Sequence, residues 1–167
     1  MRKMTEENVK AALAGESQAH IKYLAFADKA TADKLPNIAR AFKAAAYSEQ
    51  IHATNHLKTL RGIGTTADNL NVARAGENFE VEEMYPAYIN VAEAQGEKLA
   101  ITFLNYAFEA EKVHGEIYKR AQETVAKGQD LPAGPIHVCG VCGFTMEGIA
   151  PDKCPVCGSP KDKFTTF

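Results

Sequence analysis

The stretch Glu111-Lys-Val-His114 and its earlier counterpart Glu49-Gln-Ile-His52 decide how the rest of the chain is interpreted. In each stretch a carboxylate and an imidazole lie three residues apart, a spacing that places both side chains on one face of an α-helix. Apolar residues recur at steps of three and four around both stretches. The Glu and His side chains are therefore predicted to point into a helical core rather than toward solvent.

Further acidic residues lie in apolar helical stripes elsewhere in the chain. Glu16 lies in one stripe, Glu80 and Glu83 lie in another, and Glu49 and Glu111 complete a set of five carboxylates. Burying each carboxylate costs several kcal/mol, roughly, unless a counter-charge is present, and metal cations supply one. One Glu from each of two helices and a Glu-x-x-His from each of two others is the ligand pattern of di-iron and di-manganese bundles. The sequence therefore predicts a mainly α protein built on a ferritin-like four-helix bundle.

Four helices are predicted from capping residues and breaks in periodicity. The first is capped by Thr5 and ends near Thr31, and the second begins at Pro36 and ends near Arg61. The third and fourth are separated at residues 95–97, a Gln-Gly-Glu sequence. Antiparallel pairing of the first helix with the second, and of the third with the fourth, places the predicted ligands of each hairpin at matching heights.

The connection between the two hairpins decides whether one chain can build a whole bundle. In ferritin-like bundles the second and third helices run parallel, so this connection must travel the length of the bundle. If residues 67–79 are coil, they can make that return. If Thr66 or Asp68 caps a helix that runs through Glu80, only about five loop residues remain, and the third and fourth helices would complete a partner chain's site in a domain-swapped dimer. Both alternatives stay open at this point. Pro86, inside the third helix, is predicted to bend it.

A linker at residues 128–136, with two Gly and two Pro, separates the helical domain at 1–127 from a tail at 137–167. The tail is too small for a core of its own. It carries two C-x-x-C pairs, a spacing typical of a four-thiolate metal site; the cysteines are Cys139, Cys142, Cys154 and Cys157. Structural zinc is the commoner use of this spacing, whereas Pro155, nearby aromatic residues and the neighbouring di-iron site favour iron as a one-electron carrier. Zinc in the purified protein remains an alternative.

Composition excludes several classes of function. The chain has 167 residues, 24% of them charged, and a formal net charge of -2, which indicates no nucleic-acid partner. It has no long apolar run and no recognisable signal peptide, so we expect no membrane association and a cytoplasmic location. Cysteines in a reducing compartment are expected to bind metal rather than form disulfides.

With both metal sites placed, the chain resembles the rubrerythrin family, and its end is similar to rubredoxin. The resemblance extends from Ala-Gly-Glu-Ser-Gln-Ala at 14–19, through Glu80-x-x-Glu83-Met-Tyr-Pro86, to the cysteine-rich end. It implies a two-iron site and one iron on the four cysteines. The implied ligands of the two irons are Glu16, Glu49, Glu80, Glu83, Glu111, His114 and, depending on redox state, His52. It also implies that Tyr23 and Tyr88 lie near the metals and can supply protons.

The resemblance implies a non-haem di-iron peroxidase that reduces hydrogen peroxide to water, with electrons passed from the rubredoxin-type iron to the di-iron site. An external donor, rubredoxin or an NAD(P)H-dependent reductase, is expected to supply them. The tail follows the last helix, about 20 Å or more from the ligands at helical rise, so we expect a head-to-tail homodimer in which one chain's tail serves the other's site. Two alternatives remain: a ferroxidase or iron-storage bundle, and a non-catalytic electron-transfer or zinc-stabilised protein.

Overall fold

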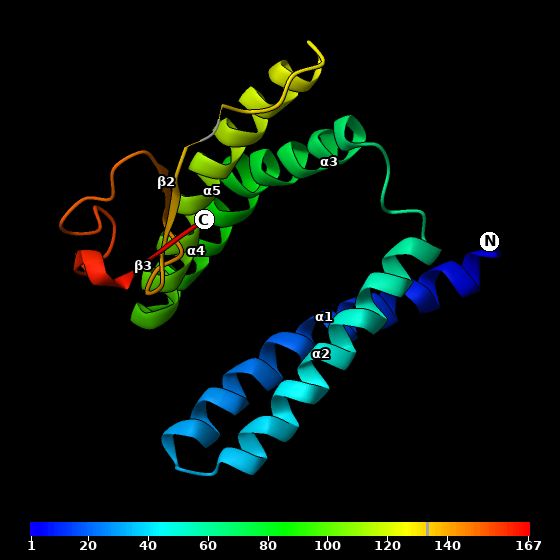
Figure 1. Ribbon diagram of the computed structural model, residues 1–167, viewed down its shortest axis with the longest axis horizontal. Helices are drawn as coiled ribbons and strands as arrows, with labels where there is room; N and C mark the ends of the chain where they lie inside the picture. The colour runs from blue at the N-terminus through cyan, green and yellow to red at the C-terminus, as the bar shows by residue number, and fades with distance from the viewer. Residues whose placement is uncertain (133) are drawn as a thin grey trace. The chain divides into compact units, whose positions relative to one another are not determined.

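The computed structural model describes residues 1–132 and 134–167, which form two compact units, Met1–Gly64 and Thr65–Phe167 (Figure 1). In the first unit, helices α1 (Lys3–Ala32) and α2 (Pro36–Thr59) form an antiparallel hairpin. Small side chains line their contact, where Ala27 and Ala46 are fully buried and let the helices approach closely. The imidazole Nδ1 of His20 on α1 lies 2.8 Å from the carbonyl oxygen of Ala46 on α2, a hydrogen bond that joins the two helices.

The predicted boundaries of this hairpin hold except at its start. Pro36 occupies the first turn of α2, as predicted, where its missing N–H costs no helical hydrogen bond. The predicted cap at Thr5 is wrong, because α1 begins two residues earlier at Lys3. Its N-cap is Arg2, whose side chain makes no capping hydrogen bond.

The second unit begins with a well-capped helix, α3 (Thr66–Phe79). The backbone N–H of Asp68 donates to the Thr65 hydroxyl at 3.2 Å, and the backbone N–H of Thr65 donates to the Asp68 carboxylate at 3.1 Å. This reciprocal capping box satisfies amide donors that would otherwise lack partners at the helix start. Residues 60–65 alone therefore connect α2 to α3, which confirms the short-connection alternative.

The helix that contains the predicted acidic pair is interrupted at residues 80–84. After α3 the chain makes a π-helical turn, η1 (Glu80–Met84), in which the Tyr85 N–H donates to the Glu80 carbonyl. It then continues as α4 (Tyr85–Gln95), with Pro86 in its first turn. Pro86 has no N–H to continue an α-helical ladder, and π-turns of this kind rotate the side chains that follow them. The break predicted at residues 95–97 is confirmed, since Gly96 ends α4 with a φ of 72°.

The long helix α5 (Lys98–Val125) packs along α3 and carries the small C-terminal sheet on another side. Gln122 of α5 accepts a hydrogen bond from the Arg74 guanidinium at 2.8 Å and donates one to the Asn71 side chain at 2.8 Å, which fixes α3 against α5. No helix in the described part of the chain is long and apolar enough to cross a membrane.

The tail forms a three-stranded antiparallel sheet in the order β2-β1-β3. Its strands are β1 (Ile136–Cys139), β2 (Thr145–Glu147) and β3 (Phe164–Thr166), with a single 3-10 turn, η2 (Lys161–Lys163), before β3. Strand β2 contacts α5, and the Arg120 guanidinium of α5 forms an ion pair with the Glu147 carboxylate of β2. The tail thus turns back along the helix from which it emerges.

Candidate metal centres

The first unit holds one group of candidate ligands, made by Glu16 of α1 with Glu49 and His52 of α2. One oxygen or nitrogen atom from each lies within 4.8 Å of the others. The Nδ1 atom of His52 lies 2.8 Å from a carboxylate oxygen of Glu49, as the three-residue spacing on a helix requires. The His52 side chain is 51% exposed, so this group lies at the surface of its own hairpin.

The second unit holds a matching group, made by Glu77 of α3 with Glu111 and His114 of α5. The His114 Nδ1 lies 2.6 Å from a Glu111 oxygen and 3.8 Å from a Glu77 oxygen. The Glu77 and Glu111 side chains are 17% and 16% exposed, and His114 is 29% exposed. Each unit therefore presents one Glu and one Glu-x-x-His, half of the di-metal pattern.

Glu77 was not among the ligands predicted from the sequence. The structure brings it into the group, whereas Glu83 lies within the π-turn with an exposed side chain outside the group. Burial, and then the charge of Glu111, raise the pKa of Glu80, which indicates that Glu80 lies close to the group. The missed signal is the spacing Glu77-x-x-Glu80, which repeats the i,i+3 step one turn earlier and reaches only the first residue of the π-turn that shifts the helical register.

The second group has the electrostatics of a cation site. Burial, and then the charge and hydrogen bonding of Glu111, raise the pKa of Glu77 to about 7. Within the described residues, the ion pairs formed by Glu77 and Glu111 are with His114 alone. Carboxylate oxygens and imidazole nitrogens suit iron and manganese, and a bound cation would remove the repulsion between these carboxylates. The donor set therefore fits the metals that the pattern implies.

The two tyrosines predicted to serve the site lie in different units of the chain. Tyr23 lines an apolar groove of about 560 Å³ together with Glu49. Tyr88, by contrast, lies on α4 and is 53% exposed. Burial, and then the charges of Glu80, Glu111 and Glu77, raise the pKa of Tyr85. This side chain therefore lies close to the second group. Its place in the Met-Tyr-Pro sequence directly after the acidic cluster was the available signal.

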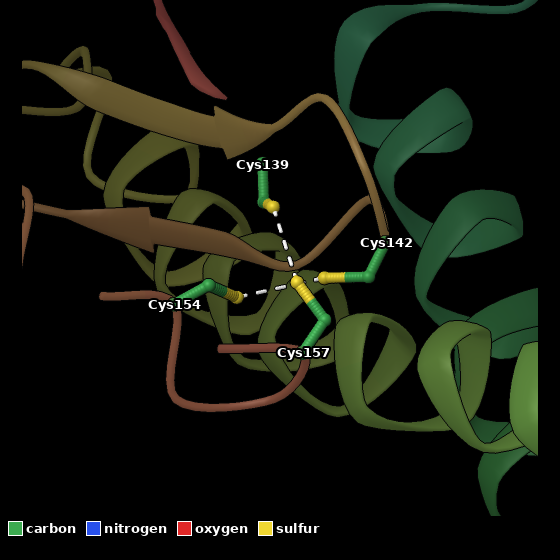
Figure 2. Close-up of side chains that lie close together, drawn as sticks. All are labelled: Cys139, Cys142, Cys154 and Cys157. Atoms are coloured by element: carbon green, nitrogen blue, oxygen red, sulfur yellow. Dashed lines mark hydrogen bonds between the residues drawn. The ribbon is translucent and has the colours of Figure 1, made fainter. Parts of the chain in front are cut away.

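The four cysteine sulfurs converge in the tail, as Figure 2 shows. The Sγ atoms of Cys139 and Cys157 lie 3.7 Å apart, and those of Cys142 and Cys154 lie 3.5 Å apart. Burial raises the pKa of the Cys142 and Cys154 thiols. Burial also acts on Cys157, but hydrogen bonds from the side chain and backbone of Ser159 prevail and lower its pKa to about 6. Four free, convergent sulfurs with backbone donors directed at them fit a tetrahedral metal site.

The tail lies beside the second carboxylate group. The His114 Nε2 is 2.8 Å from the hydroxyl oxygen of Thr145 on β2, and Tyr106 of α5 packs against the cysteine cluster. The separation of about 20 Å expected from helical rise is therefore wrong for this chain. That estimate assumed that the tail extends beyond α5, whereas the linker lets the sheet fold back along it.

These features define a helical metalloprotein class with repeated Glu and Glu-x-x-His ligands and an appended four-thiolate domain. The rubrerythrin family model matches residues 7–122, and the model of the rubrerythrin rubredoxin-like domain matches residues 137–165. The chain belongs to the rubrerythrin family. The family consists generally of di-iron oxidative-stress proteins and is an oxidoreductase family.

Several relatives span nearly all of the chain. Rubrerythrin-2 of Clostridium acetobutylicum is 40% identical over 98% of this chain and 97% of its own length. Nigerythrin of Nitratidesulfovibrio vulgaris is 36% identical over 98% of this chain and 86% of its own. The solved structure of fully reduced, all-ferrous nigerythrin has a TM-score of 0.57 at 35% identity, with 98% of this chain and 86% of that chain covered. The predicted family and the ferritin-like fold with its rubredoxin-like end are confirmed.

Proposed function

We propose that the protein is a non-haem di-iron peroxidase that reduces hydrogen peroxide to water with two electrons and two protons. The observation that carries the proposal is the presence, in one chain, of two half sets of di-metal ligands and of a four-thiolate domain whose Thr145 contacts one of them. A ferroxidase needs the carboxylates and histidines but has no use for the thiolate site. An electron carrier needs the thiolates, but carboxylates buried among apolar residues would only destabilise it.

Each half set would hold part of the iron site. Glu16, Glu49 and His52 would bind from one hairpin, and Glu77, Glu111 and His114 from the other, with Glu80 beside them. Irons bound there would supply the electrons for peroxide reduction, and iron on the four cysteines would return them singly. The raised pKa of Tyr85 keeps its hydroxyl protonated beside the carboxylates, where it can donate a proton.

The test is turnover of hydrogen peroxide by the iron-loaded, full-length protein with an artificial reductant, followed by the visible absorption of the thiolate iron. The wild-type protein should consume peroxide continuously while that absorption bleaches and returns. The Cys154→Ser variant should oxidise once and then stop, because its tail cannot bind iron. The Glu111→Gln variant should keep the thiolate absorption but lose peroxide-dependent reoxidation. Wild-type protein that stays reduced in the presence of peroxide would exclude the activity.

We also propose that the active protein is a homodimer in which each iron site combines the hairpin α1–α2 of one chain with α3–α5 of its partner. In ferritin-like topology, α3 must begin about 30 Å back along α2 to bring Glu77 level with Glu49, at about 1.5 Å rise per residue. Residues 60–65 span at most about 20–25 Å even when fully extended. The connection is therefore too short for one chain to complete its own site.

Exposed apolar side chains support this assembly. Both units leave large apolar residues uncovered; on the first these include Ile21, Phe26, Ile38 and Ile51, and on the second Phe79, Val91, Leu99 and Phe103. Monomeric proteins rarely expose extensive apolar surface, and pairing of half-bundles would bury it.

Sedimentation of the wild-type protein should show a dimer at every concentration at which it is active. Inserting about 12 Gly and Ser residues between Arg61 and Thr65 should permit the return within one chain and produce active monomer, since such linkers are flexible. The same insertion at residues 33–35, between α1 and α2, serves as the control and should leave the dimer intact. Active wild-type monomer would exclude the exchange.

A further inference from the structure

Thr145 lies at the boundary between the tail and α5. Within the described residues it is the one buried polar side chain, at 5% exposure. Its hydroxyl lies 3.2 Å from the Gly143 carbonyl oxygen and 2.8 Å from the Nε2 atom of His114. Gly143 directly follows Cys142, so this side chain lies between a cysteine knuckle and a candidate iron ligand.

The hydrogen bonds of His114 fix the orientation of its ring. Nδ1 lies 2.6 Å from a Glu111 oxygen, and a carboxylate can only accept, so Nδ1 carries the hydrogen of that bond. At the other nitrogen, the Thr145 hydroxyl lies 2.8 Å from Nε2 and can either donate to it or accept from it. With a partner at each nitrogen, the ring is held with Nδ1 facing the carboxylate oxygens, where a bound cation would take the place of the hydrogen.

We propose that Thr145 is a positioning residue by which the cysteine-rich tail holds the His114 ring in its metal-binding orientation. The inference rests on the proposed metal site and deepens it: a residue outside the helical domain controls how well that domain binds metal. Metal-binding histidines generally donate their second N–H to a fixed partner, and loss of that partner commonly weakens metal affinity about 10–100-fold.

The first test measures the contact between Nε2 of His114 and the Thr145 hydroxyl in metal-free protein. In nitrogen-15 NMR of the imidazoles, the Thr145→Val variant, which keeps the side-chain shape without the hydroxyl, should shift the His114 Nε2 resonance from its wild-type position. The Thr145→Ser variant should restore the wild-type spectrum. A His114 Nε2 resonance that is the same in wild type and in Thr145→Val overturns the inference.

The second test measures affinity for Mn²⁺, which favours carboxylate sites over thiolates, by loss of the free-ion EPR signal. The tail is first loaded with one equivalent of zinc. Thr145→Val should bind Mn²⁺ about 10–100-fold more weakly than wild type, and Thr145→Ser should match wild type. Glu147→Gln is the control, because it removes the ion pair with Arg120 without touching His114, and it should not change the affinity.

The outcomes separate the inference from the proposed function. If Glu147→Gln and Thr145→Val weaken Mn²⁺ binding equally, the effect comes from docking of the tail, and the positioning role of Thr145 is overturned. Unchanged Mn²⁺ affinity in Thr145→Val would overturn it as well. Wild-type protein that binds no Mn²⁺ would count against the proposed metal site, while the NMR measurement would still decide whether Thr145 holds His114.

Discussion

The two ligand groups carry the same residue types at the same spacing, yet their surroundings differ. In the first, His52 is 51% exposed and its hydrogen bond is with Glu49 of the same helix. In the second, His114 is 29% exposed and bonded at both ring nitrogens, to Glu111 and to Thr145 of the tail. Among the described residues, His114 therefore has a hydrogen-bond partner at each ring nitrogen, whereas the partner shown for His52 is at Nδ1 alone.

This difference assigns distinct properties to the two histidines. A side chain fixed at both nitrogens loses its rotational freedom on folding, so little more is lost when it binds a metal. His52 keeps room to move, which agrees with the expectation that this histidine is the ligand exchanged with redox state. We therefore expect the second group to bind metal more tightly than the first.

The largest effect should come from removing Glu77, the carboxylate that α3 supplies to the second group. Glu77→Gln should reduce metal affinity and peroxide turnover by more than the roughly 10–100-fold typical of outer partners, because it deletes a ligand oxygen. Glu83→Gln, six residues later and exposed, is the matched control and should remain within a few-fold of wild type. Metal analysis and steady-state turnover on both variants measure this, and the reverse order would assign the ligand to Glu83 instead.

A smaller effect should appear in the pH dependence of the metal-free second unit. Burial and Glu111 raise the pKa of Glu77 from 4.5 to about 7, so the folded state binds more protons than the unfolded state between those values. Its contribution to stability is present below pH 4.5 and is lost as the pH rises through about 7. Thermal unfolding of metal-free protein should therefore shift downward by roughly a few degrees over this interval.

Glu77→Gln tests the origin of that shift, since the variant cannot titrate at this position. Its unfolding temperature should change less with pH than that of the wild type, and the difference between the two proteins isolates the contribution of Glu77. Identical pH profiles for the two would show that this carboxylate does not carry the effect. Added metal should abolish the shift in the wild type by replacing the proton.

The parts of this structure that the sequence predicts are those that depend on local spacing. Glu49-x-x-His52, Glu111-x-x-His114 and the paired cysteines are recognisable because each set lies within one turn of chain or one knuckle. Glu77 was missed because the α-helical period was counted from Glu80 and Glu83, which lie within η1, where a π-turn shifts the register. Glu83 as a ligand stays a prediction.

The position of the tail relative to α5 could not be predicted from the sequence for a similar reason. Helical rise predicts how far α5 extends, but the return of the tail along it depends on contacts between Glu147 and Arg120 and between Thr145 and His114, which are 27 and 31 residues apart. These pairs share no periodicity. The short connection to α3, by contrast, was foreseeable as an alternative because Thr66 or Asp68 was expected to cap a helix. The structure places the cap at Thr65, with Asp68 as its partner in the capping box.

The smallest predicted effect compares the starts of the two units. Thr65→Ala removes the acceptor of the Asp68 amide and should destabilise the second unit by about 1 kcal/mol, the usual cost of an N-cap. Thr5→Ala lies inside α1, where Ala is the better helix former, and should leave the first unit unchanged or slightly more stable. Denaturant unfolding of both variants, followed by signals from each unit, measures the difference. Equal losses would mean that Thr5 does cap α1 in solution, so the hairpin would begin where the sequence predicts; a loss at Thr65 alone would confirm that a side chain caps the start of α3 and that none caps the start of α1.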